Sequence, residues 1–201
     1  MRNCAALMLL IVGTALLPGI GFAAETAATD STKVTTAKTG QTTEVAIFAE
    51  GCFWGTQYMF QKAKGVVSSR VGYTGGAKTF PTYQQVCTGT TGHLEALEVV
   101  YDPKVTSYEN MAKLFFESHD PTQTNGQGPD IGEQYKSAIF YMNDQQKEIA
   151  EKLIKQLEAK GLKVATKVLP ASQFWPAEEY HQNYYSKKGG EPYCHSFTKR
   201  F

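Results

Sequence analysis

The stretch Gly51-Cys52-Phe53-Trp54-Gly55 constrains the fold of this chain most, because it lies between a strand-like and a helix-like segment. Residues 44–49 have the apolar composition of a short buried strand, and residues 56–63 can form a helix that ends before Gly65. Cys52 is therefore expected at the N-terminus of a helix. Unpaired amides and the helix dipole favour an anion there, so we expect Cys52 to be partly thiolate at neutral pH.

The rest of the chain alternates between strand-like and helix-like segments, which predicts an α+β domain. Thr106 with Glu109 forms a capping box before one helix, and Asn143 can cap a longer helix that ends before Gly161. Further strands are expected at residues 94–101, 137–142 and 163–169. Long loops rich in Gly, Pro and Thr are expected at residues 71–92 and 118–134.

The first 24 residues have the features of a secretory signal peptide. An apolar run at residues 5–17 is followed by Pro18-Gly19, and cleavage is expected near Ala23 or Ala24. The run is shorter than the roughly 20 residues that a membrane span requires. We therefore expect an exported protein, periplasmic or secreted, with no membrane association after cleavage.

Behind this leader, residues 25–43 are rich in Thr and Ala and poor in large apolar side chains, so we expect a flexible linker. Residues 44–201 are numerous enough to bury a single core. The net charge is +1, and the 20 Lys and Arg residues are scattered along the chain. No basic stripe points to nucleic acid as a partner.

Several further motifs follow the cysteine segment in a fixed order. They are Gly72-Tyr73-Thr74-Gly75-Gly76, Thr91-Gly92-His93 with Glu95, His119-Asp120-Pro121-Thr122, Gly128-Pro129-Asp130 with Gln134-Tyr135, and Ala177-Glu178 with Tyr180-His181-Gln182. Together with Gly51 to Gly55, this series resembles the A-type peptide methionine sulfoxide reductases over roughly Thr43 to Tyr193. The resemblance implies a two-layer α/β sandwich with a ferredoxin-like core and long coil segments. It also implies reduction of the S epimer of methionine sulfoxide, in proteins and peptides and as the free amino acid.

Reduction of a sulfoxide requires a nucleophile for the sulfur, a proton source for the oxygen, and a pocket for the S-methyl group. Cys52 is the candidate nucleophile, and Phe53 and Trp54 are candidates for an apolar wall with sulfur–aromatic contact. The resemblance assigns the proton donor to Glu95. On the expected strand Glu95 shares a face with apolar residues, which would raise its pKa, as a general acid needs. Glu98 lies on the opposite face, which argues against a glycosidase-like carboxylate pair.

Three further site residues follow from the resemblance alone. It implies that Tyr83 and Tyr135 offer hydroxyl groups to the sulfoxide oxygen, and that Asp130 orders the site through its hydrogen bonds. Without the matched motifs, each tyrosine would be read as a packing residue.

Oxidation of Cys52 to a sulfenic acid requires a second thiol to resolve it. Cys194 is the best candidate, because it follows a segment rich in Lys and Gly in a tail expected to be mobile from about residue 186. Cys87 is the competitor, and we expect it to be a buried structural thiol. The resemblance implies a thioredoxin or thioredoxin-like electron donor for the disulfide. We expect no cofactor, no metal and a monomer.

Other classes of protein stay open at this point. A cysteine hydrolase would pair Cys52 with a histidine, a peroxidase would use Cys52 alone, and a zinc site could draw on Cys194 and His195. A secreted binding domain would carry an inert disulfide, from Cys194 to Cys52 or to Cys87. By default His195 is interpreted as a plain tail residue and His181 as a hydrogen-bonded one.

Overall fold

The computed structural model describes residues 42–201. The expected signal peptide and nearly all of the expected linker lie outside the described residues, so both stay predictions. Among residues 42–201, no helix has the length and apolar character needed to cross a membrane.

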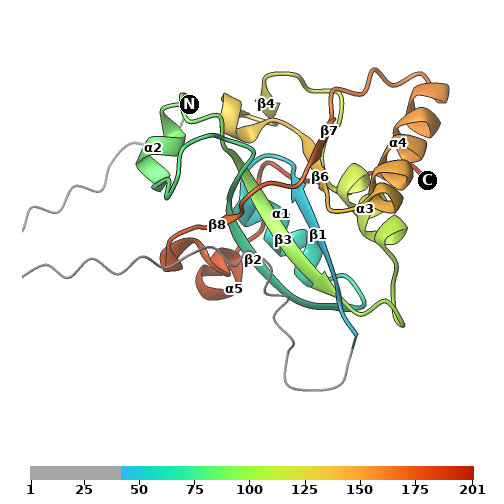
Figure 1. The fold of residues 1–201 in the computed structure, drawn as a ribbon, viewed down its shortest axis with the longest axis horizontal. Coiled ribbons are helices and arrows are strands. Elements are labelled where there is room, and N and C mark those ends of the chain that lie inside the picture. Colours follow the sequence, from blue (N-terminus) through green and yellow to red (C-terminus); the bar gives the residue numbers. More distant parts are fainter. Residues whose placement is uncertain (1–41) are drawn as a thin grey trace, which may run out of the picture. The chain divides into compact units, whose positions relative to one another are not determined.

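A six-stranded mixed sheet forms the centre of the domain, with the strand order β7-β6-β1-β3-β2-β8 (Figure 1). Neighbouring strands run antiparallel, except that β6 and β7 are parallel. The strands are β1 (Glu44–Ala49), β2 (Val66–Thr74), β3 (Leu94–Tyr101), β6 (Ala138–Tyr141), β7 (Lys167–Pro170) and β8 (Trp175–Pro176). A separate two-stranded ribbon pairs β4 (Gly126–Gln127) with β5 (Asp130–Ile131).

The helices complete a βαββαβ unit. They are α1 (Phe53–Gln61), α2 (Tyr83–Cys87), α3 (Tyr108–Ser118), α4 (Asp144–Ala159) and α5 (Tyr184–Lys188), with 3-10 turns at Glu133–Tyr135 and Glu179–His181. Helix α1 connects β1 to β2, and α3 lies between β3 and β6 in the chain. With the order β6-β1-β3-β2, this is the ferredoxin-like arrangement, extended at its edges by β7 and β8. The predicted fold class is confirmed.

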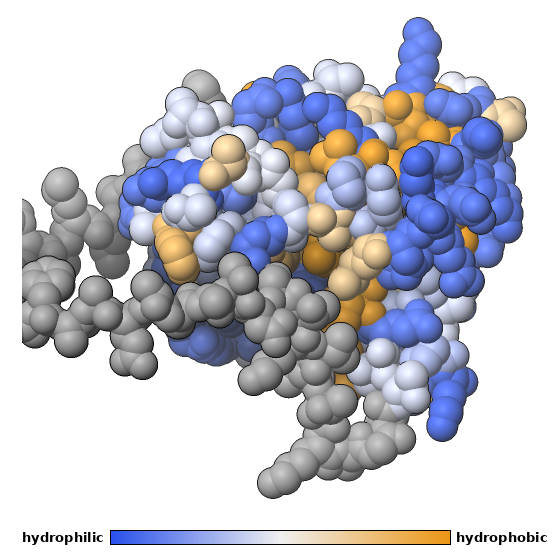
Figure 2. Space-filling model, viewed as in Figure 1, coloured by the Kyte–Doolittle hydropathy of each residue, from blue (hydrophilic) through white to orange (hydrophobic). Residues whose placement is uncertain are grey.

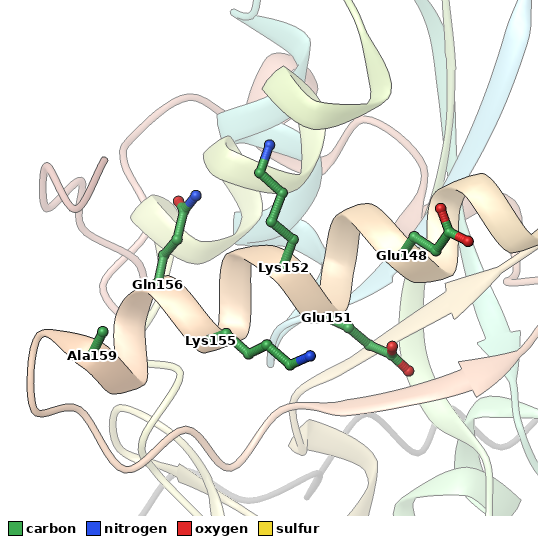
Figure 3. A pocket seen from close by; sticks show the side chains of 6 residues that line it. All are labelled: Glu148, Glu151, Lys152, Lys155, Gln156 and Ala159. Carbon is green, nitrogen blue, oxygen red and sulfur yellow. The ribbon is translucent and has the colours of Figure 1, made fainter.

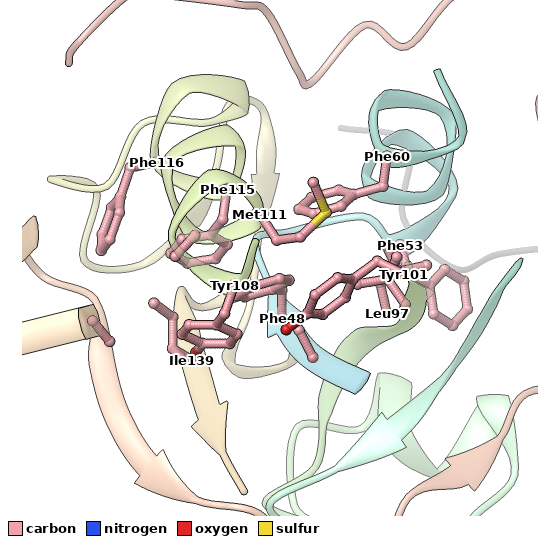
Figure 4. Packing of buried hydrophobic residues seen from close by; sticks show 14 of the residues in the cluster. Phe48, Phe53, Phe60, Leu97, Tyr101, Tyr108, Met111, Phe115, Phe116 and Ile139 are labelled. Atoms are coloured by element: carbon pink, nitrogen blue, oxygen red, sulfur yellow. The ribbon is translucent and has the colours of Figure 1, made fainter. Parts of the chain in front are cut away.

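The main core lies between the sheet and the helices α1, α3 and α4. Phe48 on β1 is at its centre: its ring lies 5.3 Å from that of Phe60 and 5.2 Å from that of Phe115 (Figure 4). The alternate residues of β1, Ile47 and Ala49, point to a smaller cluster on the other face. Helices thus cover one face of the sheet, and Figure 2 shows a hydrophilic outer surface over α4.

Most expected elements are present, with shifted boundaries. Residues 94–101 and 138–141 are strands, whereas the strand expected from residue 163 begins only at Lys167. The Asn143 side chain caps α4 by accepting a hydrogen bond from Gln146 N at 2.9 Å, as predicted. The predicted Thr106 capping box is wrong, because the side chain of Ser107 accepts the hydrogen bond from the α3 amide instead.

The C-terminal tail packs against α3. Glu117 accepts hydrogen bonds from the Arg200 and Phe201 amides at 2.9 and 3.1 Å, and Thr198 N donates to Glu117 O at 2.7 Å. The structure therefore shows the tail in a docked arrangement, which brings the residues before Thr198 to the N-terminus of α1. The predicted mobility from about residue 186 stays a prediction.

Candidate active site

Cys52 is the N-cap residue of α1, as predicted. Its own side chain does not cap the helix; the carboxyl group of Glu95 does so instead, its Oε2 accepting a hydrogen bond from Phe53 N at 3.1 Å. Glu95 is only 2% exposed, and it lies on the face of β3 that also buries Leu97. The structure thus places the predicted proton donor directly beside the helix end that carries the predicted nucleophile.

The second predicted redox residue lies beside the first. The donor atoms of Cys52, Cys194 and Asp130 all lie within 4.8 Å of one another, and both thiols are free and buried. Cys87 ends α2 and is partly exposed, so the expectation of a buried Cys87 is wrong. The chain therefore brings together the two cysteines that a sulfenic acid cycle requires.

The expectation that Cys52 is partly thiolate at rest is wrong. Hydrogen bonding to Cys194 and burial raise the pKa of the Cys52 thiol well above its ordinary range. The backbone hydrogen bond at Trp54 lowers this pKa, as expected at a helix N-terminus, but it is the weaker influence. Cys52 is accordingly a thiol in the resting, reduced protein.

The aromatic residues next to Cys52 have different environments. Phe53 is 1% exposed and belongs to the main core. Trp54 is partly exposed; its ring stacks on Tyr184 at 3.8 Å and its Nε1 donates to His181 Nδ1 at 3.0 Å. The His181 ring also lies 4.4 Å from that of Tyr83, so it connects two of the predicted substrate residues.

Asp130 is held by a residue that the sequence does not single out. Tyr193 OH donates to Asp130 Oδ1 and Oδ2 at 3.0 and 3.1 Å. Tyr193 is 66% exposed and directly precedes Cys194, so this contact lies at the solvent edge of the thiol pair. Tyr135, the remaining predicted tyrosine, is partly buried in the 3-10 turn that follows β5.

Two buried polar residues were missed. His195 is not a plain tail residue: its side chain is fully buried, and its Nδ1 lies 3.1 Å from Cys194 Sγ. Glu50, which directly precedes Gly51, is fully buried as well. The one signal for Glu50 in the sequence is an acidic residue directly after the apolar run at residues 45–49.

One hollow of the described surface lies on α4. The hollow in Figure 3 is formed by α4 side chains of mixed charge and contains no thiol: Glu148, Glu151, Lys152, Lys155, Gln156 and Ala159. The donors of Cys52, Asp130 and Cys194 form a metal-compatible group. A soft cation there would occupy the proposed nucleophile and its resolving thiol together.

Paired thiols at a helix N-terminus, with a carboxylate in the same site, define a thiol-dependent redox enzyme as the class of this protein. The family described as PMSR, peptide methionine sulfoxide reductase, matches residues 44–201. A peptide methionine sulfoxide reductase MsrA from Methanosarcina acetivorans is 50% identical over 153 residues, which cover 75% of this chain and 81% of the relative. The chain belongs to the peptide methionine sulfoxide reductase family, which confirms the predicted resemblance.

Solved structures agree with this assignment. Mxr1 from Saccharomyces cerevisiae in reduced form has a TM-score of 0.72 and 37% identity, covering 77% of this chain and 92% of that one. Mxr1 in complex with Trx2 has a TM-score of 0.54 and 26% identity, covering 82% of this chain and 96% of that one. The fold of a methionine sulfoxide reductase therefore carries the site described above.

Proposed function

We propose that this enzyme reduces the S epimer of methionine sulfoxide, in oxidised proteins and peptides and as the free amino acid, through a sulfenic acid on Cys52. The observation that carries the proposal is the placement of two buried thiols, Cys52 and Cys194, within 4.8 Å of each other and of Asp130. Neither a hydrolase nor a one-cysteine peroxidase requires a second thiol at this distance. The family assignment supports the sulfoxide as substrate.

In the first step, Cys52 Sγ attacks the sulfoxide sulfur while Glu95 gives its proton to the oxygen. Because Cys52 is a thiol at rest, its own proton restores Glu95. The sulfoxide is reduced to the thioether, and Cys52 is oxidised to the sulfenic acid. Tyr83 and Tyr135 offer hydroxyl groups to the sulfoxide oxygen, and Trp54 contacts the methyl group.

In the second step, Cys194 Sγ forms a disulfide with Cys52, and the oxygen of the sulfenic acid leaves as water. A dithiol donor of the thioredoxin type then reduces the disulfide by exchange. The complex that Mxr1 forms with Trx2 supports a thioredoxin as the kind of partner. If the leader directs export, a thioredoxin-like domain outside the cytosol supplies the electrons to a monomeric enzyme.

A single-turnover experiment tests this function. The reduced full-length chain is mixed with each epimer of a methionine sulfoxide peptide, without an external reductant, and methionine is measured. We expect methionine from the S epimer only, no product with Cys52→Ser, and one full turnover with Cys194→Ser. Cys87→Ser is the control and should behave as the wild type. Absence of methionine from both epimers, with reactive thiols present, would refute the proposal.

A further inference from the structure

The resolving thiol has a histidine of its own. Cys194 Sγ lies 3.1 Å from His195 Nδ1, and the Cys194 carbonyl accepts a hydrogen bond from Gln127 Nε2 at 3.2 Å. The contact is therefore made by adjacent residues of a tail segment that is fixed on β4. Neither residue is exposed by more than 7%.

The hydrogen bonds of the ring define its tautomer. His195 Nε2 lies 2.9 Å from Glu50 O, and a carbonyl oxygen can only accept, so Nε2 carries the hydrogen. In a neutral imidazole, Nδ1 is then an acceptor, and the only hydrogen available for the 3.1 Å contact is that of the Cys194 thiol. Burial lowers the pKa of His195, which keeps the ring neutral and able to take a proton.

The N-terminal turn of α1 makes room for this ring. A Cβ atom on Gly55 would lie 2.3 Å from His195 Nδ1, so any side chain there would displace the ring from Cys194. A Cβ atom on Gly51 would lie 2.4 Å from the Cβ of Gln127, the residue that holds the Cys194 carbonyl. The two glycines that enclose the Cys52 segment thus also provide the place where the His195 ring sits.

Behind the ring lies an unusual buried carboxyl group. Glu50 Oε2 accepts a hydrogen bond from Ser118 at 2.9 Å, whereas Oε1 makes no hydrogen bond within the described residues and lies 3.7 Å from His195 Nε2. Burial raises the pKa of Glu50 to about 8. A positive charge on His195 favours ionisation of Glu50, and a negative charge on Glu50 favours protonation of His195. The pair is neutral at rest, yet it can carry a transient charge.

We propose that His195 is the general base of the resolution step and that Glu50 is its positioning residue: the Glu50 carbonyl holds Nε2, and the Glu50 carboxyl group, 3.7 Å away, can balance the charge that the ring acquires. The inference rests on the proposed function, because it concerns the sulfenic acid formed there. The S–H bond of Cys194 breaks as its proton passes to His195 Nδ1, the S–S bond to Cys52 forms, and the S–O bond of the sulfenic acid breaks. The sulfenic sulfur is reduced, the Cys194 sulfur is oxidised, and hydroxide leaves with the proton from His195 as water.

His195→Gln removes the proposed base and retains the hydrogen bond that holds the side chain in place. A glutamine amide can still donate to Glu50 O, but it has no basic nitrogen. Formation of methionine in the first turnover should be unchanged, while formation of the disulfide should slow on the order of 10²-fold at neutral pH. The sulfenic acid should accumulate and be trapped by dimedone. Phe197→Gln, which introduces the same residue two positions later at a side chain 56% exposed, is the matched control and should leave both rates unchanged.

The pH dependence distinguishes a base from a structural residue. In His195→Gln, hydroxide must ionise the Cys194 thiol, so the rate of disulfide formation should rise about tenfold per pH unit, whereas the wild-type rate should vary much less. Glu50, Asp130 and His119 are the other titratable groups that act on His195. They are present in both proteins, so the ratio of the two rates isolates His195. If His195→Gln fails to fold, Glu50→Gln should show a smaller defect in the same step.

In a second form of the experiment, the sulfenic acid is generated without the sulfoxide. Hydrogen peroxide oxidises Cys52 directly, and disulfide formation is then followed in the same variants. Slowing in both forms of the experiment supports the inference. Equal rates for the wild type and His195→Gln, with the same pH profile, would overturn it. A wild type that yields no methionine, but whose peroxide-driven disulfide still depends on His195, would refute the proposed function alone.

Discussion

Replacing Glu50 by glutamine should remove a loss of stability that this buried carboxyl group imposes as the pH rises. Glu50 is fully buried directly after β1, and burial raises its pKa from about 4.5 to about 8. The neighbouring His195, Ser118 and Thr56 oppose this rise, but burial outweighs them. The carboxyl group is therefore protonated in the folded protein at neutral pH, although it would be ionised in the unfolded chain.

The sign and size of the effect follow from proton linkage. Between about pH 4.5 and 8 the folded state retains a proton that the unfolded state has lost, so stability falls as the pH rises. The contribution is fully present below about pH 4.5, decreases through this range and is gone above about pH 8. Over about 3.5 pH units, at about 1.4 kcal/mol per unit, the total is about 5 kcal/mol. Glutamine is neutral at every pH and does not incur this loss.

The assay is urea unfolding of the reduced full-length chain, followed by tryptophan fluorescence, from about pH 5 to about pH 9. The free energy of unfolding of Glu50→Gln minus that of the wild type should grow by about 4 kcal/mol over this range. Groups common to both proteins cancel in the difference. Glu148→Gln, the same change on the exposed face of α4, is the control. Parallel pH curves for Glu50→Gln and the wild type would refute the reasoning.

Three further changes test the site and the core. Cys194→Ala should lower the pKa of Cys52 and speed its alkylation near neutral pH, because the hydrogen bond to Cys194 is the main cause of the raised pKa. Serine can keep a hydrogen bond at this position and alanine cannot, so identical alkylation profiles for Cys194→Ala and Cys194→Ser would contradict this. Glu95→Gln keeps an acceptor for the α1 amide, so we expect unchanged thermal stability but methionine formation slower by about 10²–10⁴-fold. Phe48→Ala should cost about 3–5 kcal/mol of unfolding free energy, whereas Val67→Ala, at a side chain 53% exposed, should cost less than about 0.5.

Local patterns in the sequence predict the elements well and their ends less well. The alternation over residues 94–101 places Glu95 on the buried face, and Asn143 marks the start of α4. Thr106 and Ser107 are equally good N-cap residues by type, however, and the choice between them depends on the backbone conformation of the turn after β3. The βαββαβ succession alone does not give the order of the strands in the sheet, because that order depends on which strands pair.

Some residues of the site can likewise be predicted from local sequence, and others cannot. Cys52, Glu95 and Cys194 follow from motifs and from the requirements of the chemistry, and the structure brings them together. His195 could not be predicted, because its burial depends on contacts between the tail and α3 that have no local signature. The raised pKa of Cys52 was missed for a related reason: a helix N-terminus is a local feature, whereas burial and the neighbouring thiol come from distant parts of the chain.

At rest, three groups of the site are neutral in the folded protein, although some of them would be charged in water. Cys52 is a thiol, Glu50 is protonated and His195 is uncharged, and burial contributes to all three states. Isolated buried charges would be costly, so a neutral resting state is the stable way to bury reactive groups. In the mechanism that we propose, each charge arises only when a reaction step requires it: on Cys52 as the sulfoxide oxygen takes a proton, and on His195 as Cys194 attacks. The raised pKa of Cys52 lowers the fraction of thiolate at rest, so Cys52 should react more slowly with electrophiles than an exposed cysteine does.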